Sequence, residues 1–344
     1  MDSTRLVVGE FQLTQDAKRN KPSKGKKSKE KKEDGASGYN FEVKMIKLDA
    51  NNLEMDFIGF PIALINAYRR IILAEVATMA IEKVYMYNNT SIIQDEVLAH
   101  RLGLVPLKVD PRFFEFRNAD DSEWGAQDSV KYELKTICQK NARAASNETD
   151  ADVIYLNRKV LSSSLTWVPI GNQTDIFKPA NMGPLHDDIL LAKMNPGHLI
   201  HLEAYAVKGV GSDHAKFQPG IASYRYLPEI ELTREVEGTQ AELLQKCFSP
   251  GVIDIVTKSD GKKVAKVNDA RNDTCSRNVF EYDSIKDAVK LTRKTDHVIF
   301  YVESQSALKS FEMLDEAVNI MIGKCDTLIT EIDKQIERTT VQIN

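Results

Sequence analysis

The sequence has few of the residues that build metal centres, disulfide frameworks or membrane spans. It contains four cysteines in 344 residues, and no two of them form a Cys-x-x-Cys pair, which argues against a paired-ligand zinc site. The longest apolar-rich run, residues 57–65, is about half the length of a membrane-spanning helix. Residues 1–15 have no uninterrupted apolar core of the kind a signal peptide needs. We therefore expect an intracellular protein that binds no metal.

Catalytic motifs are also scarce. The six histidines include His198 and His201, but the apolar residues around them predict a strand, in which residues three apart point to opposite faces. The sequence has no Gly-x-Ser-x-Gly elbow and no Walker-type Gly-Lys-Ser/Thr, and its Gly-x-Gly near residue 210 lacks the third glycine of a dinucleotide fingerprint. We therefore expect no catalytic residue, no cofactor-binding residue and no enzyme activity of the chain's own.

Charge is divided unevenly along the chain. Residues 1–40 contain ten Lys/Arg against six Asp/Glu, a net charge of +4, so the rest contains 36 against 44, a net charge of -8. An acidic body disfavours binding of nucleic acid over a broad face, because that binding depends on Lys and Arg. Residues 18–32 carry nine positive charges and no large apolar side chain, which predicts a disordered basic tail over residues 1–38. A nuclear import signal, a phosphate-contacting arm and a solubilising tail all fit this composition.

Hydropathy periods predict strands and helices in turn over the first third of the ordered chain. Apolar residues alternate with polar ones on both sides of the turn at residues 49–52, and Pro61 then opens a segment with apolar residues at steps of three and four. A later short helix is expected to end before Gly103. The expected elements are strands over residues 41–48, 53–57 and 81–87, and helices over residues 61–79 and 95–102.

The middle of the chain is rich in turn residues, and its helix signals are weak. A capping-box pattern at residues 284–287 predicts one short helix near its end. The expected elements are strands over residues 130–137, 153–156, 199–207 and 297–303, and a helix over residues 284–291.

The last segment has the clearest pattern in the sequence. Apolar residues follow one another at alternating steps of three and four over a helix of about 30 residues, which would span about 45 Å. So narrow a seam favours packing on a helix of another chain over packing on the chain's own sheet alone. Cys325 falls on this seam and is expected to be a small buried apolar residue. The seam residues are Phe311, Leu314, Val318, Met321, Cys325, Leu328 and Ile332.

Three motifs carry a resemblance to a known family. Residues 60–76, FPIALINAYRRIILAEV, resemble the first conserved helix of the alpha-type subunits of cellular RNA polymerases. Residues 89–107, NTSIIQDEVLAHRLGLVPL, resemble the continuation of that motif, and residues 208–219, KGVGSDHAKFQP, are similar to a third signature of the archaeal and eukaryotic members. The motifs occur in the family's order, and the resemblance extends from about Phe41 to Cys325.

Further segments favour one branch of this family. Residues 166–173, 187–193 and 269–274 are similar to the larger alpha-like subunit shared by RNA polymerases I and III, more than to its polymerase II counterpart, which is the alternative. The polymerase II type commonly carries a zinc-binding cysteine cluster, which the cysteine spacing excludes here. Archaeal relatives can hold an iron-sulfur centre, and residues 245–282 resemble that ferredoxin-like insert without its ligands.

The resemblance implies an α+β fold with a discontinuous dimerisation domain. Residues 39–88 plus 295–344 would supply strands and two packed helices, one of them long and C-terminal. A mixed, largely β insert domain, residues 89–294, would interrupt it and include the ferredoxin-like remnant without metal ligands.

The resemblance also implies a function. The chain would be a non-catalytic architectural subunit of DNA-directed RNA polymerases I and III, which transcribe rRNA, tRNA and 5S rRNA. It would form a heterodimer with a smaller alpha-like subunit, and that pair would be the assembly platform for the largest and second-largest subunits. It would contact DNA only through the complex, contact no membrane, and lie in the nucleus, in both nucleolus and nucleoplasm.

Site residues follow from the matched motifs. The dimer interface is expected to include Ile65, Tyr68, Ile72, Phe311, Leu314, Val318, Met321, Cys325 and Leu328. Docking of other subunits is expected at Arg69, Arg70, Asp95, Glu96, His100, Arg101, Asp213, His214 and Lys216. Two structural alternatives stay open. Arg69 and Arg70 could form a helix edge that is paired within the chain, and Asp213, His214 and Lys216 could form an internally hydrogen-bonded turn. Two other classes also stay open, namely a hydrolase or oxidoreductase that uses Asp213 and His214, and a free nucleic-acid-binding protein that uses the tail.

Overall fold

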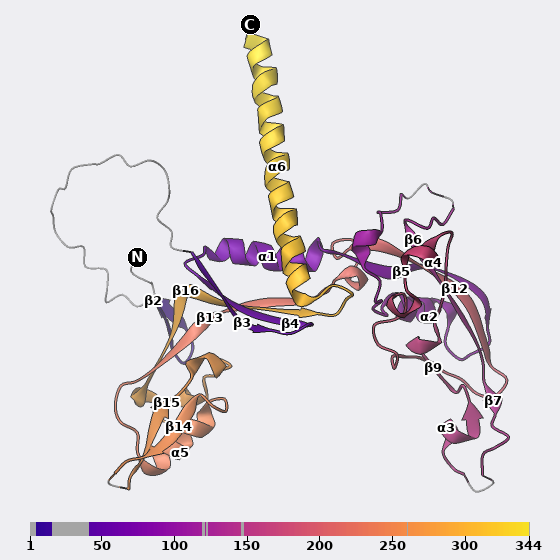
Figure 1. The fold of residues 1–344 in the computed structure, drawn as a ribbon. Coiled ribbons are helices and arrows are strands. Elements are labelled where there is room, and N and C mark those ends of the chain that lie inside the picture. Colours follow the sequence, from indigo (N-terminus) through magenta and orange to yellow (C-terminus); the bar gives the residue numbers. More distant parts are fainter. Residues whose placement is uncertain are drawn as a thin grey trace. The chain divides into compact units, whose positions relative to one another are not determined.

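The computed structural model describes residues 5–15, 41–118, 121, 123–145, 148–259 and 261–343. The chain contains both helices and antiparallel β-sheets (Figure 1), which confirms the expected α+β class. The basic segment at residues 18–32 lies outside the described residues. The chain divides into two compact units. One comprises Met1–Lys47, Glu54–Asn66 and Ser223–Tyr301, and the other comprises Leu48–Leu53, Ala67–Ala222 and Val302–Asn344.

A six-stranded sheet forms the centre of the first unit. The strands expected at residues 41–48, 53–57 and 297–303 are all present in it, and the last of them is longer than expected. The sheet order is β2 (Leu13–Gln15), β1 (Arg5–Val8), β16 (Val289–Ser304), β4 (Asn52–Ile58) and β3 (Glu42–Leu48), and β13 (Gly220–Leu232) also pairs with β16. β3 lies at the sheet's end, and all seven of its residues are exposed.

Two expectations about this sheet were wrong. Residues 5–15 were expected in the disordered tail, but β1 pairs in antiparallel register with β16, and Val8 is buried. Residues 284–291 were expected to form a helix, but only Lys286–Ala288 form a 3-10 turn, and β16 then begins at Val289. Burial of Val289 and Leu291 in the unit's core outweighs the local capping pattern, because tertiary packing commonly overrides weak helix propensity.

The same core of the first unit also takes in a short helix and a hairpin. Helix α5 (Gly238–Cys247) packs with strands β14 (Ile253–Thr257) and β15 (Lys263–Val267), which pair with each other in antiparallel register. Short 3-10 turns follow at Ala270–Asn272 and Asn278–Glu281. This is the part of the chain expected to be a ferredoxin-like remnant.

The first helix is shorter than its apolar spacing predicts. α1 spans Ile62–Ala74, directly after Pro61, and β5 (Ala77–Asn89) takes over where the pattern predicted helix to residue 79. The backbone N–H of Ser212 donates to the carbonyl of Ala74 at 2.9 Å and satisfies the helix end. Val76 and Met79 are buried, as their apolar spacing predicts. Met79 lies in a strand and not in a helix, because β5 forms eleven residue pairs with β12.

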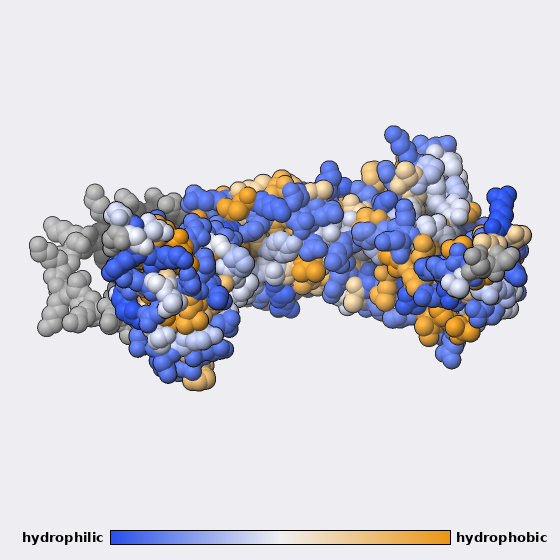
Figure 2. Space-filling model, turned by 90° about the horizontal axis from the view of Figure 1, so that it is seen from below, coloured by the Kyte–Doolittle hydropathy of each residue, from blue (hydrophilic) through white to orange (hydrophobic). Residues whose placement is uncertain are grey.

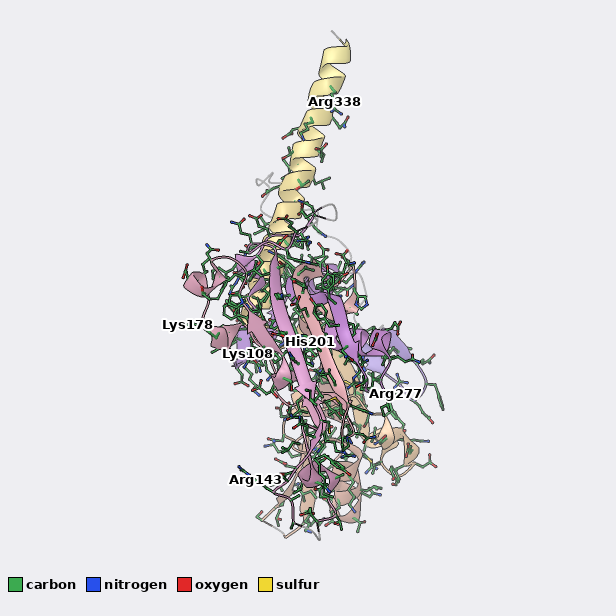
Figure 3. All side chains as sticks on the ribbon, turned by 90° about the vertical axis from the view of Figure 1, so that its right-hand side faces the viewer. Lys108, Arg143, Lys178, His201, Arg277 and Arg338 are labelled. Carbon is green, nitrogen blue, oxygen red and sulfur yellow. The ribbon has the colours of Figure 1, made fainter. Side chains whose placement is uncertain are left out.

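A four-stranded sheet dominates the second unit. Its order is β10 (Thr166–Val168), β6 (Ser129–Ile137), β12 (Leu199–Val210) and β5, which confirms the strands expected at residues 81–87, 130–137 and 199–207. Helix α2 (Asp95–Gly103), also as expected, buries Leu98 and Leu102 in the core beside this sheet. The outer face of the sheet carries His201, which Figure 3 shows over the long strands.

Small elements fill the rest of the second unit. Residues 153–156 were expected as a strand but divide between a helical turn and two strand residues, because Asp150 caps the turn by accepting from the backbone N–H of Asp152. The remaining elements are η2 (Pro111–Phe113), β7 (Gln139–Lys140), α3 (Ala151–Ile154), β8 (Tyr155–Leu156), β9 (Lys159–Leu161), η3 (Ser162–Ser164), α4 (Gln173–Ile176), η4 (Pro179–Asn181), β11 (Leu190–Lys193) and η5 (Ala215–Phe217).

The C-terminal helix α6 spans Ser310–Ile343 and is uninterrupted (Figure 1), as its heptad pattern predicts. Its start is anchored to the β3–β4 turn, because the N–H of Ser310 donates to the carbonyl of Ala50 at 3.1 Å and its hydroxyl to that of Asp49 at 3.2 Å. Met313 and Ala317 are fully buried in the first two turns. No helix in the described part of the chain is long and apolar enough to cross a membrane.

Candidate assembly interfaces

Residues 322–336 of α6 present an uncovered apolar stripe. Every residue from Ile322 to Ile336 is exposed. Ile322, Cys325, Ile329, Ile332 and Ile336 follow at steps of three, four, three and four, so their side chains lie on one face of the helix. Between 50% and 58% of each of these isoleucines is exposed. A helix with such a face gains stability by packing it on another helix.

The structure divides the expected seam into two parts. Leu314 is buried in the chain itself, and Val318 and Met321 are half-buried, so this part of the seam packs largely within the chain. Phe311 and Leu328 are exposed. Cys325 was expected to be buried, but it is exposed, because the helix has left the chain's own core at that point. The sequence interpretation missed Ile322, Ile329 and Ile336, although their spacing carried the same signal.

The apolar face of α1 is covered by its own chain. Ile65 and Ile72 have no exposed surface, so they are core residues here and we do not include them in a surface for a partner. Tyr68 and Arg69 are half-buried, and Arg70 is exposed. Of the residues expected on this helix, Arg70 is therefore the one whose side chain is most open to a second protein.

The polar residues of α2 have two different roles. Arg101 donates from Nε to the carbonyl of Leu191 at 3.1 Å and from Nη2 to that of Leu190, which ties α2 to β11. Asp95 accepts a hydrogen bond from the side-chain amide of Asn89 at 2.7 Å at the start of the helix. Glu96 and His100 are exposed, as are the apolar neighbours Ile92, Val97 and Leu104. The α2 surface thus consists of these three exposed apolar side chains together with the exposed Glu96 and His100.

The loop before β13 is an internally bonded turn that keeps some exposed side chains. The ring Nδ1 of His214 accepts from the N–H of Lys216 at 3.1 Å, and Lys216 Nζ donates to the carbonyl of Ile81 at 2.9 Å and contacts the Glu82 carboxylate. This is the turn that the sequence left open for the last three docking residues. Asp213 and His214 are nevertheless exposed at its surface.

Two glycines of this loop are required by close packing. A Cβ on Gly209 would lie 2.6 Å from the ring of Phe217, and a Cβ on Gly211 would lie 2.0 Å from the carbonyl oxygen of Leu73. Atoms cannot approach that closely, so only glycine fits at either position. The Gly-x-Gly is therefore explained by packing of the loop on α1 and η5.

The loop and α2 border a shared hollow. About 320 Å³ of space lies between Val84 on β5, Ala99 and His100 on α2, and His214 and Lys216 on the loop. The docking surface expected from the sequence included His100, His214 and Lys216, but the sequence did not show that these residues are neighbours. The fold brings them together because α2 and the loop both pack beside β5.

A charged network that the sequence interpretation missed lies in the first unit. Arg271, on the turn Ala270–Asn272, donates to both carboxylate oxygens of Asp56, at 2.9 and 2.8 Å, and to Glu54 at 2.9 Å. His297 Nε2 lies 2.9 Å from the same Asp56 carboxylate. Burial raises the pKa of Asp56, but the hydrogen bonds from Arg271 and His297 outweigh it, so the pKa lies below its usual value. Residue 271 belongs to a matched motif, but nothing local revealed its partners.

The cysteines are dispersed through the fold. Cys138 is fully buried beside the carbonyl of Met194, and burial raises the pKa of its thiol. Cys247 is buried in the core of the first unit, and Cys275 is half-buried. Within the described ranges, no group of three or more His, Cys, Asp or Glu side chains is arranged to hold a metal ion.

Comparison with known families shows which family this chain belongs to. The family model for the RNA polymerase Rpb3/Rpb11 dimerisation domain matches residues 54–325. The chain belongs to this family. The resemblance drawn from the three sequence motifs is therefore confirmed.

Relatives in the family separate the two branches. DNA-directed RNA polymerases I and III subunit RPAC1 of Homo sapiens is 49% identical over 295 residues, which cover 86% of this chain and 85% of the relative. The subunit of the same name in Mus musculus is 46% identical over 331 residues, 96% of this chain and 95% of the relative. DNA-directed RNA polymerase II subunit rpb3 of Dictyostelium discoideum is 29% identical over 304 residues, 86% of this chain and 94% of the relative. The chain is thus more similar to the polymerase I and III branch, as predicted.

Proposed function

We propose that the chain is a non-catalytic architectural subunit of DNA-directed RNA polymerases I and III. The observation that carries this proposal is the exposed apolar stripe over residues 322–336 of α6, in a chain of the Rpb3/Rpb11 dimerisation family. The subunits named RPAC1 support the choice of polymerases, and the lower identity to a polymerase II subunit disfavours that alternative. Work in rRNA, tRNA and 5S rRNA synthesis, in nucleolus and nucleoplasm, would follow.

The stripe is the surface for the smaller alpha-like subunit. Four isoleucines and Cys325 on one face extend over four turns of helix, from Ile322 to Ile336, which suits a partner helix packed along them. The N-terminal turns of α6 are fixed to the chain through Ser310, so the stripe is presented from a rigid base. Residues 39–88 plus 295–344 would be the dimerisation domain, and residues 89–294 the insert, in this proposal.

Docking of the large subunits is assigned to the α2 and loop surface. Glu96, His100, Asp213 and His214 are exposed there. Arg101 is exposed too, but its guanidinium is bound to backbone carbonyls of β11, and the half-buried Lys216 is bound to the carbonyl of Ile81. Exposed apolar side chains on α2 give this surface an apolar centre. Figure 2 shows that hydrophobic residues lie in separate groups on the face of the molecule seen from below. An apolar centre with a polar rim is the usual anatomy of a protein–protein interface.

An affinity-purification experiment tests this function. A tagged copy of the full-length chain is expressed in its own cells and purified at moderate salt, and the co-purifying proteins are identified by mass spectrometry. The proposal expects two distinct sets of largest and second-largest polymerase subunits, together with one smaller alpha-like subunit. Recovery of a single set would restrict the chain to one polymerase, and recovery of the chain alone would refute the proposal.

A further inference from the structure

Strand β5 is an edge strand with a hollow on each face. The sheet order places it last, so in the described part of the chain it pairs with β12 on one side and with no strand on the other. From Glu82 to Asn88 its residues are exposed or half-exposed. An open edge presents backbone N–H and C=O groups that another extended chain can pair with.

Two bulges limit the regular part of this edge. The register with β12 shifts once between Tyr205 and Ala206 and again between His201 and Leu202, which leaves Glu82 and Tyr87 of β5 as the extra residues. β5 pairs regularly with β12 over residues 77–81, where residues 78–81 are buried, and again between the two bulges over the exposed or half-exposed residues 83–86. Because bulges bend a strand and end its pairing, an added strand would have about four residues to pair with.

The hollow on the outer face has a rigid aromatic wall. It holds about 660 Å³ and is lined by Tyr85, Trp124, Arg117 and Asp213, among others. The Trp124 ring stacks on Tyr205 with centroids 4.4 Å apart, and the Arg117 guanidinium lies 4.1 Å above the Trp124 ring centroid. Trp124 Nε1 also donates to the Tyr85 hydroxyl at 3.3 Å. These contacts hold the wall in one arrangement before any partner arrives.

The hollow on the other face is the one bordered by α2. Val84 lines it, whereas its neighbour Tyr85 lines the aromatic hollow, as expected because successive side chains of a strand point to opposite faces. Glu82, His214 and Lys216 line both hollows at the end of the regular edge. A strand added to β5 would alternate in the same way and place successive side chains on the two sides.

We propose that residues 83–86 of β5 accept an extended segment of a protein partner by strand addition, with alternate side chains in the two hollows. The proposal deepens the proposed function and rests on it, because the partner is taken to be another protein of the polymerase. Its segment would carry an aromatic or large apolar side chain for the wall formed by Tyr85 and Trp124. That wall can pack such a side chain without losing a hydrogen bond of its own.

The same segment would carry a Lys or Arg. Three of the cations that line the aromatic hollow have partners, since Arg117 contacts Asp128 at 2.7 Å, Lys208 donates to the carbonyl of Phe114 at 2.9 Å and Lys216 donates to that of Ile81 at 2.9 Å. The fourth, Lys83, is exposed at the rim. Carboxylates at the rim include the exposed Asp213. A cation on the partner would meet this carboxylate and the faces of the exposed tyrosines.

The observations favour a protein over a nucleic acid. Near His201, which Figure 3 labels on the long strands, Lys131 forms an ion pair with Glu203 at 2.7 Å, and His201 itself lies 3.4 Å from Glu133. Platforms for single-stranded nucleic acid pair stacked aromatics with cations that are available to phosphates. Here the Lys131 ammonium already has the Glu203 carboxylate beside it, and the His201 ring lies beside Glu133.

Amide hydrogen exchange tests strand addition directly. The full-length chain is measured alone and in the purified polymerase, with the amides of residues 83–86 as the readout. Strand addition slows the exchange of the amides on the open edge by about tenfold or more. Amides of β10, at the opposite edge of the same sheet, are the internal control and should change little. Equal exchange at residues 83–86 in the two samples would overturn the proposal.

Two tyrosines provide a matched pair of variants. Tyr85 and Tyr87 are both exposed on β5, but only Tyr85 lines the aromatic hollow. Tyr85→Ser should remove most of the added protection in the polymerase, whereas Tyr87→Ser should keep it. Asp213→Asn is a second, surface variant that leaves the sheet intact and should weaken the protection. Equal protection in all three variants would refute the assigned side-chain contacts.

The other outcomes are also informative. Protection that appears in the isolated chain on adding oligouridine, or on raising its own concentration, would overturn the assignment to a polymerase protein. If the polymerase contains the chain but residues 83–86 stay unprotected, only this inference fails. If no large subunit co-purifies with the chain, the proposed function itself fails.

Discussion

Arg271 holds Asp56 with both arms of its guanidinium group. Nη1 donates to one carboxylate oxygen at 2.9 Å and Nη2 to the other at 2.8 Å, and only 5% of the Asp56 side chain is exposed. His297 contacts the same carboxylate, so the buried charge has two partners. Within the first unit, this contact joins the Ala270–Asn272 turn to β4. The motif at residues 269–274 is thus explained by a structural requirement.

Removing this arginine should destabilise the first unit. Arg271→Ala leaves the Asp56 carboxylate buried with one partner fewer, and we expect a loss of about 2 to 3 kcal/mol in the free energy of unfolding. Urea unfolding of the full-length chain, followed by fluorescence, measures it. Lys286→Ala removes an ion pair with Asp283, a side chain that is 92% exposed, and should change the midpoint little. A midpoint for Arg271→Ala equal to that of Lys286→Ala would contradict this account.

The same network predicts a pH dependence. Burial raises the pKa of Asp56, but the hydrogen bonds from Arg271 and His297 lower it by more than burial raises it. The pKa of Asp56 therefore lies below the ordinary 3.8. A carboxyl group with a lowered pKa stabilises the fold above its unfolded-state pKa, and this stability is lost as the pH falls through the folded-state value. Unfolding should therefore become easier below about pH 4. Asp56→Asn should have a flatter pH profile in that range, and an unchanged slope would refute the assignment.

Gly211 and Gly323 should respond in opposite ways to alanine. A Cβ at position 211 would lie 2.0 Å from the carbonyl oxygen of Leu73, and we expect Gly211→Ala to cost more than about 2 kcal/mol. A Cβ at position 323, inside α6, meets nothing within 4 Å, so Gly323→Ala should stabilise the helix by about 1 kcal/mol. Thermal unfolding of both variants measures this. A higher melting temperature for Gly211→Ala would contradict the packing described here.

Local sequence patterns correctly predicted those helices and strands whose tertiary contacts favour the same structure as the local pattern. The heptad spacing of α6 is a property of consecutive residues, and it predicted a helix of about 30 residues where the structure has one of 34. The turn chemistry of residues 49–52 likewise predicted the β3–β4 pair. α1 ends earlier than predicted because Val76 and Met79 fit both a helical stripe and a buried strand, and only pairing with β12 decides between them.

Contacts between residues far apart in the chain could not be predicted from the sequence. Arg271 meets Asp56 across 215 positions, and Lys216 meets Ile81 across 135, so neither partner could be read from a local pattern. For Ile65 and Ile72 the stripe on α1 was real, but the sequence did not show whether the chain itself or a partner covers it. The structure shows that the chain itself covers both.

Pairing through α6 is the central claim, and the mass of the complex tests it most directly. The full-length chain is co-expressed with the smaller alpha-like subunit, and native mass spectrometry measures the complexes formed. Ile329→Asp with Ile332→Asp places two charges on the stripe, whereas Thr327→Asp places one on the opposite face of the same exposed segment. We predict a one-to-one complex for the wild type and for Thr327→Asp, and unpaired chains for the double variant. An undiminished yield of complex from the double variant would contradict the claim.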